Sequence, residues 1–150
     1  MPSPARPDRR YDEVRRRLPP PVPGGRTVGA WIDDDGVEHE LVSGNRDEWF
    51  AVAAAYARER GWVKGRAVLG LARHVEVKFA MRMRARDLQR RPGDPPIKAT
   101  IVIDRPPCGV VVPGEWTCDG TLDDWLPPGA TLTVIDRDGT RYTYRGTEEA

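Results

Sequence analysis

The most constraining feature of the sequence is a short, largely apolar segment, residues 99–103, with prolines on both sides. The stretch from Pro92 to Pro96 precedes it and Pro106 follows it, so neither flank can extend a helix or continue a central strand. The segment has the length of a strand and lacks the apolar–polar alternation of a half-exposed one. We therefore expect a strand that is covered on both faces.

Segments with strand and helix character alternate around this strand. We expect two strands, then two helices, then the apolar strand, a third helix and two final strands. The predicted strands are residues 27–32, 37–42, 99–103, 131–135 and 141–144, and the predicted helices are residues 45–60, 73–89 and 118–126. In the first helix, Asn45 serves as the cap and Glu48 completes a capping box. This order predicts an α/β sandwich, with about three helices around a five-stranded mixed sheet.

The first 25 residues differ in composition from the rest of the chain. They contain seven of the fifteen prolines, three of them consecutive at positions 19–21. Asp8 is placed to cap a short helix that runs to about Leu18. We expect residues 1–25 to form a linker or tether outside the fold, residues 26–147 to form the compact domain, and residues 148–150 to form a tail.

Length and composition favour one globular domain. The chain has 150 residues and a formal net charge of +1, and no apolar run approaches the roughly 18 residues of a membrane span. No signal peptide is visible and no membrane partner is expected. Charge is nevertheless uneven, because residues 64–98 carry ten Lys and Arg against three acids. Lys78, Arg82 and Arg86 recur along one helical face, which favours a solvated surface and leaves a phosphate-binding face as the alternative.

Three of the four His and Cys residues lie at the ends of predicted elements. His74 opens the second helix, Cys108 follows the apolar strand, and Cys118 opens the third helix. One imidazole and two thiolates form a zinc site that keeps its fourth tetrahedral position open, which is the catalytic type. A closed structural site would need His39, which lies in the first predicted hairpin.

Glu76 gives this group a chemical role. In a helix interior, residues two apart point about 200° away from each other, but at a first turn His74 sits at the cap and Glu76 can lie beside the metal. A carboxylate that is close to the metal without binding it is placed as a proton shuttle. The combination of H-x-E with a later P-C and a second cysteine is typical of zinc-dependent nucleobase deaminases. The other interpretation is a capped helix with two buried cysteines.

The sequence resembles the SCP1.201-like deaminases, a bacterial toxin-type family of the cytidine deaminase-like superfamily that includes DNA cytosine deaminases. The resemblance spans residues 26–146 and rests on residues 37–44, 74–80, 99–103, 107–108 and 126–134. It implies a three-layer sandwich in which His74, Cys108 and Cys118 bind zinc and Glu76 moves protons. It also implies conversion of cytosine to uracil in DNA, and we favour single-stranded over double-stranded DNA.

Candidate substrate contacts lie near these residues, namely Ser43, Gly44, Val75, Pro107 and Trp116. Among Trp31, Trp116 and Trp125, which are candidates for stacking on bases, we expect two to belong to the core. The chain departs from similar sequences in two places. Asp104-Arg105 replaces a pair of asparagines that similar sequences usually show. The nine residues between Cys108 and Cys118 exceed the two of the P-C-x-x-C pattern in most zinc deaminases.

Toxin character implies a cognate immunity protein and secretion or injection into the cytoplasm of a target cell. We expect a monomer. Two other functions are open at this point: deamination of RNA or free cytidine, and binding of zinc or nucleic acid without catalysis.

Overall fold

A computed structural model describes residues 7–65 and 69–147 of the chain. Its elements follow one another as α1 (Pro7–Arg17), β1 (Val28–Ile32), β2 (Glu38–Val42), α2 (Glu48–Glu59), the 3₁₀ turn η1 (Gly70–Arg73), α3 (Val75–Asp87), β3 (Lys98–Ile103), α4 (Cys118–Trp125), β4 (Thr131–Ile135) and β5 (Arg141–Arg145). Within these residues, no helix combines the length and the apolar character that a membrane span requires.

The five strands form one mixed sheet in the order β2-β1-β3-β4-β5. Strands β3 and β4 run parallel, and the other neighbours are antiparallel. The apolar segment therefore occupies the centre of the sheet, where Ile101 lies between Trp31 of β1 and Val134 of β4. The predicted α/β fold with a five-stranded mixed sheet is confirmed.

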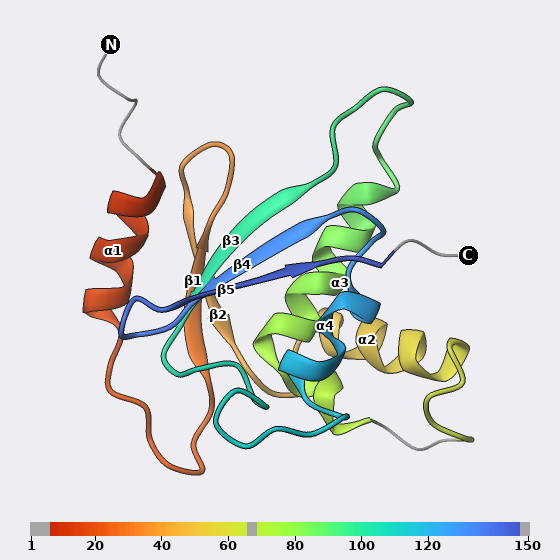
Figure 1. Cartoon of the computed structure of the whole chain (residues 1–150), viewed down its shortest axis with the longest axis horizontal. Coiled ribbons are helices and arrows are strands. Elements are labelled where there is room, and N and C mark those ends of the chain that lie inside the picture. The colour runs from red at the N-terminus through yellow and green to blue at the C-terminus, as the bar shows by residue number, and fades with distance from the viewer. Residues whose placement is uncertain (1–6, 66–68, 148–150) are drawn as a thin grey trace.

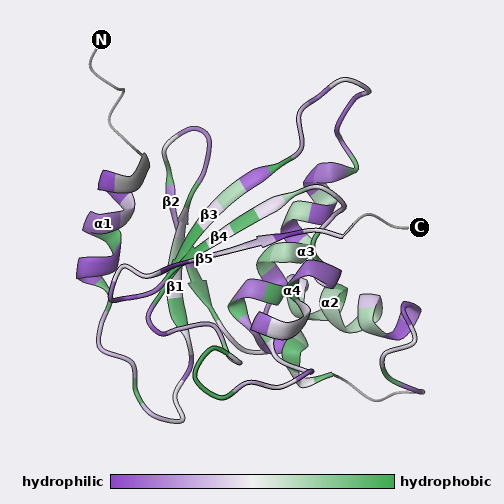
Figure 2. Ribbon diagram, in the orientation of Figure 1, coloured by the Kyte–Doolittle hydropathy of each residue, from purple (hydrophilic) through white to green (hydrophobic). Residues whose placement is uncertain are grey.

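Helices cover both faces of this sheet, with α1 on one side and α2, α3 and α4 on the other (Figure 1). The side chains of β3 alternate between the two layers. Ile101 and Ile103 belong to the larger core under α2–α4, whereas Val102 belongs to the smaller core under α1. Hydrophobic colour marks much of β3 and β4, while the outer side of α1 is mostly hydrophilic (Figure 2). The three-layer sandwich thus contains four α-helices rather than about three.

Helix α1 corrects, for residues 7–25, the prediction that residues 1–25 lie outside the fold; residues 1–6 are outside the described residues. Tyr11, Val14 and Leu18 are buried at i, i+3 and i+7 and form the apolar stripe of a helix that packs on the sheet. The short helix predicted to end near Leu18 is present. The proline-rich residues 19–25 connect it to β1 and thus lie within the domain. The predicted tail, residues 148–150, is outside the described residues.

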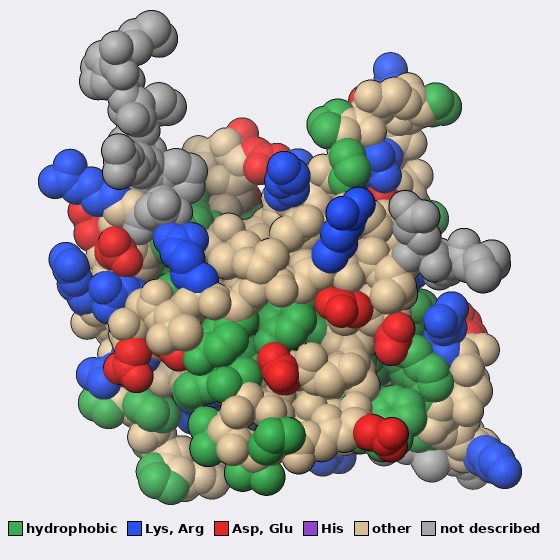
Figure 3. Space-filling view, in the orientation of Figure 1, with side chains coloured by type: hydrophobic (Ala, Val, Ile, Leu, Met, Phe, Trp, Pro, Cys, Tyr) green, Lys and Arg blue, Asp and Glu red, His purple; other side chains and the backbone are tan. Residues whose placement is uncertain are grey.

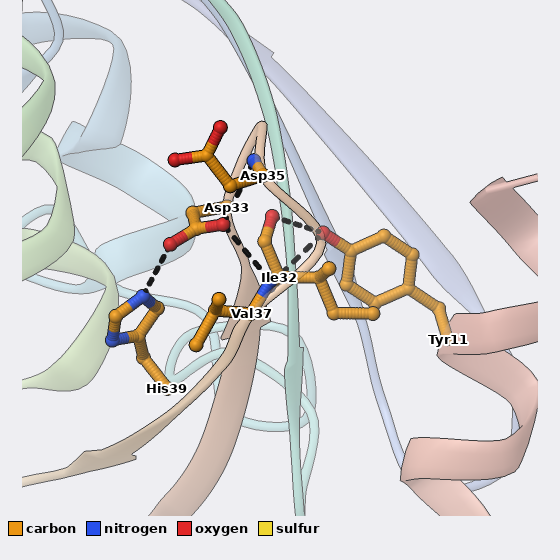
Figure 4. Close-up of polar contacts among 6 residues, drawn as sticks. All are labelled: Tyr11, Ile32, Asp33, Asp35, Val37 and His39. Atoms are coloured by element: carbon orange, nitrogen blue, oxygen red, sulfur yellow. Dashed lines mark hydrogen bonds and ion pairs between the residues drawn. The ribbon is translucent and has the colours of Figure 1, made fainter.

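Polar contacts fasten α1 and the β1–β2 turn to each other (Figure 4). The Tyr11 hydroxyl lies 3.4 Å from both the carbonyl oxygen and the amide nitrogen of Ile32. The Asp33 carboxylate accepts a hydrogen bond from the Val37 N–H at 2.9 Å and lies 2.7 Å from His39 Nε2. His39 therefore has a structural partner within the hairpin.

The boundaries of most helices and strands fall within a few residues of those predicted. The capping residue of α2, however, differs from the predicted one. The N-cap is Asp47 instead of Asn45, and its carboxylate accepts the N–H of Phe50 at 3.0 Å. Asp47 also forms an ion pair with Lys78, which fixes the carboxylate at this position. The predicted stop at Gly61 is confirmed by its left-handed φ of 75°.

Loss of packing under α1 tests whether this helix belongs to the folded domain. The side chain of Val14 is 3% exposed, so we expect Val14→Ala to lower the free energy of unfolding by about 1–2 kcal/mol, through lost burial and an incompletely filled cavity. Urea denaturation measures the change. Glu13→Ala, on the exposed side of the same helix, is the matched control and should change it by less than about 0.5 kcal/mol. Equal effects would show that α1 is not part of the folded core.

The hairpin turn predicts a pH dependence of stability. Hydrogen bonds from His39 and from the Val37 N–H lower the pKa of the Asp33 carboxyl. The ionised form is therefore favoured in the folded state, and its contribution is present above the unfolded pKa of about 3.9 and lost as the pH falls through the lower folded value. We expect the stability difference between the native protein and Asp33→Asn to shrink as the pH falls below about 3.9. A difference that does not change with pH would contradict this assignment.

Candidate metal centre and active site

His74 is the N-cap residue of α3 and has extended backbone geometry, with φ −74° and ψ 143°. Its imidazole forms no capping hydrogen bond. Instead, its Nδ1 atom lies 3.2 Å from Cys118 Sγ and 3.4 Å from Cys108 Sγ. The cap position therefore directs the ring away from the helix toward both thiols, and Glu76 follows in the first turn of the same helix.

The two cysteines lie close together because a hydrogen bond joins the two ends of the loop between them. Cys108 lies beyond the end of β3, and Cys118 is the first residue of α4. The Cys118 N–H donates to Cys108 Sγ at 3.0 Å. Gly109 has φ 96°, and a Cβ at this position would lie 2.2 Å from Thr117 Oγ1, so the close approach requires glycine here. Nine intervening residues therefore do not prevent the thiols from converging.

His74, Cys108 and Cys118 each offer one ligand atom, and these atoms lie within 4.8 Å of one another. Tetrahedral zinc, with bonds of about 2.0–2.3 Å, holds its ligand atoms roughly 3.3–3.8 Å apart. The separations of 3.2 and 3.4 Å from His74 to the two sulfurs are thus close to those that coordination requires. Imidazole and thiolate are also the donors that zinc prefers. The group fits a three-ligand zinc site.

The two thiols differ in their electrostatics, because hydrogen bonding to Cys108 and burial raise the pKa of Cys118, whereas the pKa of Cys108 is lowered and favours binding of a cation. Hydrogen bonding by Cys118, with a further contribution from His74, lowers the pKa of the Cys108 thiol to about 4. Cys108 is therefore a thiolate at neutral pH, which is the form that binds metals. Both cysteines lie close to helix N-termini, whose positive dipole ends favour negative charge.

Glu76 is 3% exposed, yet it lines the same cleft as His74 and Cys108. Burial raises the pKa of its carboxyl, although hydrogen bonding by Cys118 and the charge of His74 oppose this shift. A buried carboxyl beside three metal-binding side chains, with its pKa shifted toward neutrality, is suited to accept and return protons.

The cleft has a volume of about 560 Å³, which lies within the range of small-molecule sites. Ser43 and Gly44, both predicted as substrate contacts, line it together with Glu76. Val75 and Pro107 are buried and do not line it. Trp116 is 51% exposed, does not line it either, and contacts Trp62 with ring centroids 5.9 Å apart. Substrate contact by these last three residues stays a prediction.

The other predicted stacking candidates lie inside the fold. Trp125 is fully buried in the main core. Trp31 packs between the ring of His39, at 4.9 Å, and that of Phe79, at 5.2 Å. Both follow the expectation that two of the three tryptophans serve packing.

Sequence reasoning missed one wall of the cleft because part of that wall, Gly24 and Gly25, lies in the segment assigned to a tether. Residues 24–27 line the cleft, and Arg105 holds them in place. Its guanidinium donates to the carbonyl oxygens of Gly25 at 3.3 Å and Arg26 at 2.9 Å, and pairs with Asp104 at 2.9 Å. The Asp104-Arg105 pair thus has a defined structural role. No local sequence signal predicts a contact across this distance.

The predicted solvated face on α3 is wrong for Lys78, which is buried, whereas Arg86 is exposed as expected. Lys78 is 6% exposed and donates to the carbonyls of Val42 at 2.8 Å and Gly44 at 3.1 Å and to Asp47 at 2.6 Å. Arg82 lies over the rings of Trp31 and Trp49, and Arg86 pairs with Asp34. On the surface that Figure 3 shows, Lys and Arg lie scattered among Asp and Glu.

Lys78 ties the helix that bears His74 and Glu76 to the Ser43–Gly44 wall. Lys78→Met leaves two carbonyl oxygens and one carboxylate without their donor, so we expect a loss of about 2–4 kcal/mol in the free energy of unfolding. Chemical denaturation measures the loss. Lys64→Met removes an exposed lysine and should change the value by less than about 0.5 kcal/mol. Indistinguishable variants would mean that the ammonium does not hold this wall.

Comparison with known proteins agrees with this geometry. A search of curated proteins finds no match. The family model described as SCP1.201-like deaminase matches residues 4–150, a range that includes α1, the cleft and all four residues of the centre. The chain therefore belongs to the SCP1.201-like deaminase family.

Proposed function

We propose that this deaminase is zinc-dependent and converts cytosine to uracil in DNA, with single-stranded DNA preferred. The observation that carries the proposal is the convergence of His74, Cys108 and Cys118 within 4.8 Å of one another, beside the buried carboxyl of Glu76. A structural zinc site does not need such a carboxyl, so this arrangement favours catalysis over a binding module.

The reaction is hydrolytic: cytosine and water give uracil and ammonia. His74 Nδ1 and the two thiolates would hold zinc, which when bound acidifies water and so supplies a nucleophile at neutral pH. Glu76 accepts the proton that the attacking water loses and delivers it to N3 of the base. The carboxyl then assists departure of the C4 amino group as ammonia. Burial suits Glu76 to the first step of this cycle, because a raised pKa makes the carboxylate a stronger base for the proton of water.

The depth of the centre supports an unpaired base as substrate. Cys118 is buried and Glu76 is nearly so, and the cleft that leads to them has room for a nucleobase. A base stacked in a duplex cannot reach such a centre unless it is extruded, which costs a few kcal/mol. Single-stranded DNA avoids that cost.

The biological setting that we propose rests on the resemblance to toxin-type members of the family. In this setting the protein acts as a monomer in the cytoplasm of a target cell, after secretion or injection. A cognate immunity protein neutralises it there.

The direct test of function is uracil formation. Zinc-loaded protein is incubated with matched single-stranded and duplex DNA that present cytosine in all neighbouring contexts, and uracil is detected by glycosylase cleavage. We expect uracil on single-stranded DNA at a higher rate than on duplex. Glu76→Gln should lower the rate by about 10²–10⁴-fold while one zinc per chain is retained. Uracil formation only in RNA or free cytidine would overturn the DNA assignment, and none from any substrate would overturn the enzymatic one.

Dependence on the metal is a separate prediction. Removal of zinc by a chelator should abolish uracil formation, and added zinc should restore it. Cys108→Ser replaces a ligand thiol and should lower the zinc content measured by mass spectrometry together with the activity. Full activity in metal-free protein would contradict the proposal.

A further inference from the structure

Two arginines at the cleft, Arg26 and Arg73, differ from Arg105, the third arginine of its lining, and from Arg82 and Arg86 on α3. Arg105 is paired with Asp104, Arg82 lies over aromatic rings, and Arg86 is paired with Asp34. The side chains of Arg26 and Arg73 are exposed and have no hydrogen-bond or ion-pair partner within residues 7–65 and 69–147. Both line the cleft that contains His74 and Glu76.

Arg26 and Arg73 both adjoin Gly44, Arg26 through its side chain and Arg73 through its backbone. The guanidinium carbon of Arg26 is 4.0 Å from the position that a Cβ would take on Gly44. The carbonyl oxygen of Arg73 accepts the Gly44 N–H at 2.9 Å. The two residues come from segments 47 positions apart, and both adjoin Gly44, which follows the end of β2. Their convergence is thus a product of the fold and not of local sequence.

The lining of the cleft is suited to an anion beside a base. It contains three arginines, and its acidic member is the buried Glu76. Four lining residues are glycines, which leave room for a ligand to approach the backbone closely: Gly24, Gly25, Gly44 and Gly70. A guanidinium without an internal partner offers its full set of donors to a phosphate, which it binds in a bidentate manner.

We propose that Arg26 and Arg73 form a phosphate-binding subsite that holds the backbone next to the target nucleotide. The substrate is then a base carried on a phosphodiester chain, and free cytidine lacks the group that this subsite binds. The link to cytosine chemistry rests on the proposed function, whereas phosphate binding itself does not.

The test uses a fluorescently labelled thymidine oligonucleotide, which contains no cytosine, so that binding is measured without turnover. Zinc-loaded native protein is compared with Arg26→Gln/Arg73→Gln by fluorescence anisotropy at several salt concentrations. The matched control, Arg91→Gln/Arg137→Gln, removes the same charge from exposed side chains outside the cleft. Zinc content and the thermal unfolding midpoint are recorded for each protein to establish that all are folded.

We expect the cleft variant to bind at least about tenfold more weakly, and its slope of log K against log salt to fall by about 1.4, the value for two phosphate contacts on a single strand. Each single variant should lose about half of that slope. The control should lose less than half as much affinity as the cleft variant. Equal losses in the two double variants, or no loss in either, would overturn the subsite.

These outcomes are independent of the uracil assay. If native protein makes no uracil but the cleft variant alone loses affinity and slope, the subsite stands and the proposed function fails. If native protein makes uracil and the two double variants bind alike, the proposed function stands and the subsite fails.

Discussion

The structure depends on the burial of β3 on both faces. Ile101 and Ile103 are buried under α2–α4, and Val102 is buried under α1, so the strand is stable only when helices cover both sides of the sheet. α1 supplies the second cover, and the chain between α1 and β1 is thereby brought to the end of the sheet where β3 stops. Residues 24–27 of that connection form one wall of the cleft. The requirement for a covered central strand therefore contributes directly to the shape of the candidate active site.

The centre itself forms where three elements end at the same edge. Strand β3 runs parallel to β4, and the connection between them passes through Cys108 and then α4, whose first residue is Cys118. In such a crossover the helix begins near the carboxyl end of the first strand, which is where α/β proteins place ligands. The N-cap of α3 brings His74 to the same point, and Glu76 follows it in the first turn. Each of these residues thus lies at or near the end of a helix or strand, where backbone groups and side chains are free to face a ligand.

Much of the centre could be predicted from sequence because its signals are local. A histidine two residues before a glutamate at a helix start, and a cysteine after an apolar strand, are recognisable without knowledge of the fold. The central position of residues 99–103 followed from their composition for the same reason. The role of α1 was missed because the prolines that flank it are typical of a linker. Its three buried side chains are recognisable as core residues only once the sheet on which they pack is known. Lys78 was missed because its partners lie more than 30 residues away, and the approach of Arg26 and Arg73 to one glycine was missed because the two arginines are 47 positions apart.

The most direct test of the account is the coordination shell of zinc in the loaded protein, measured by X-ray absorption at the zinc edge. An open site formed by His74, Cys108 and Cys118 should show two sulfur neighbours at about 2.3 Å, one imidazole nitrogen at about 2.0–2.1 Å and one further light atom that is not a protein ligand. The sulfur count should fall to one in Cys118→Ser. A shell without sulfur, or one closed by four protein ligands, would contradict the central claim that His74, Cys108 and Cys118 form an open catalytic site beside Glu76.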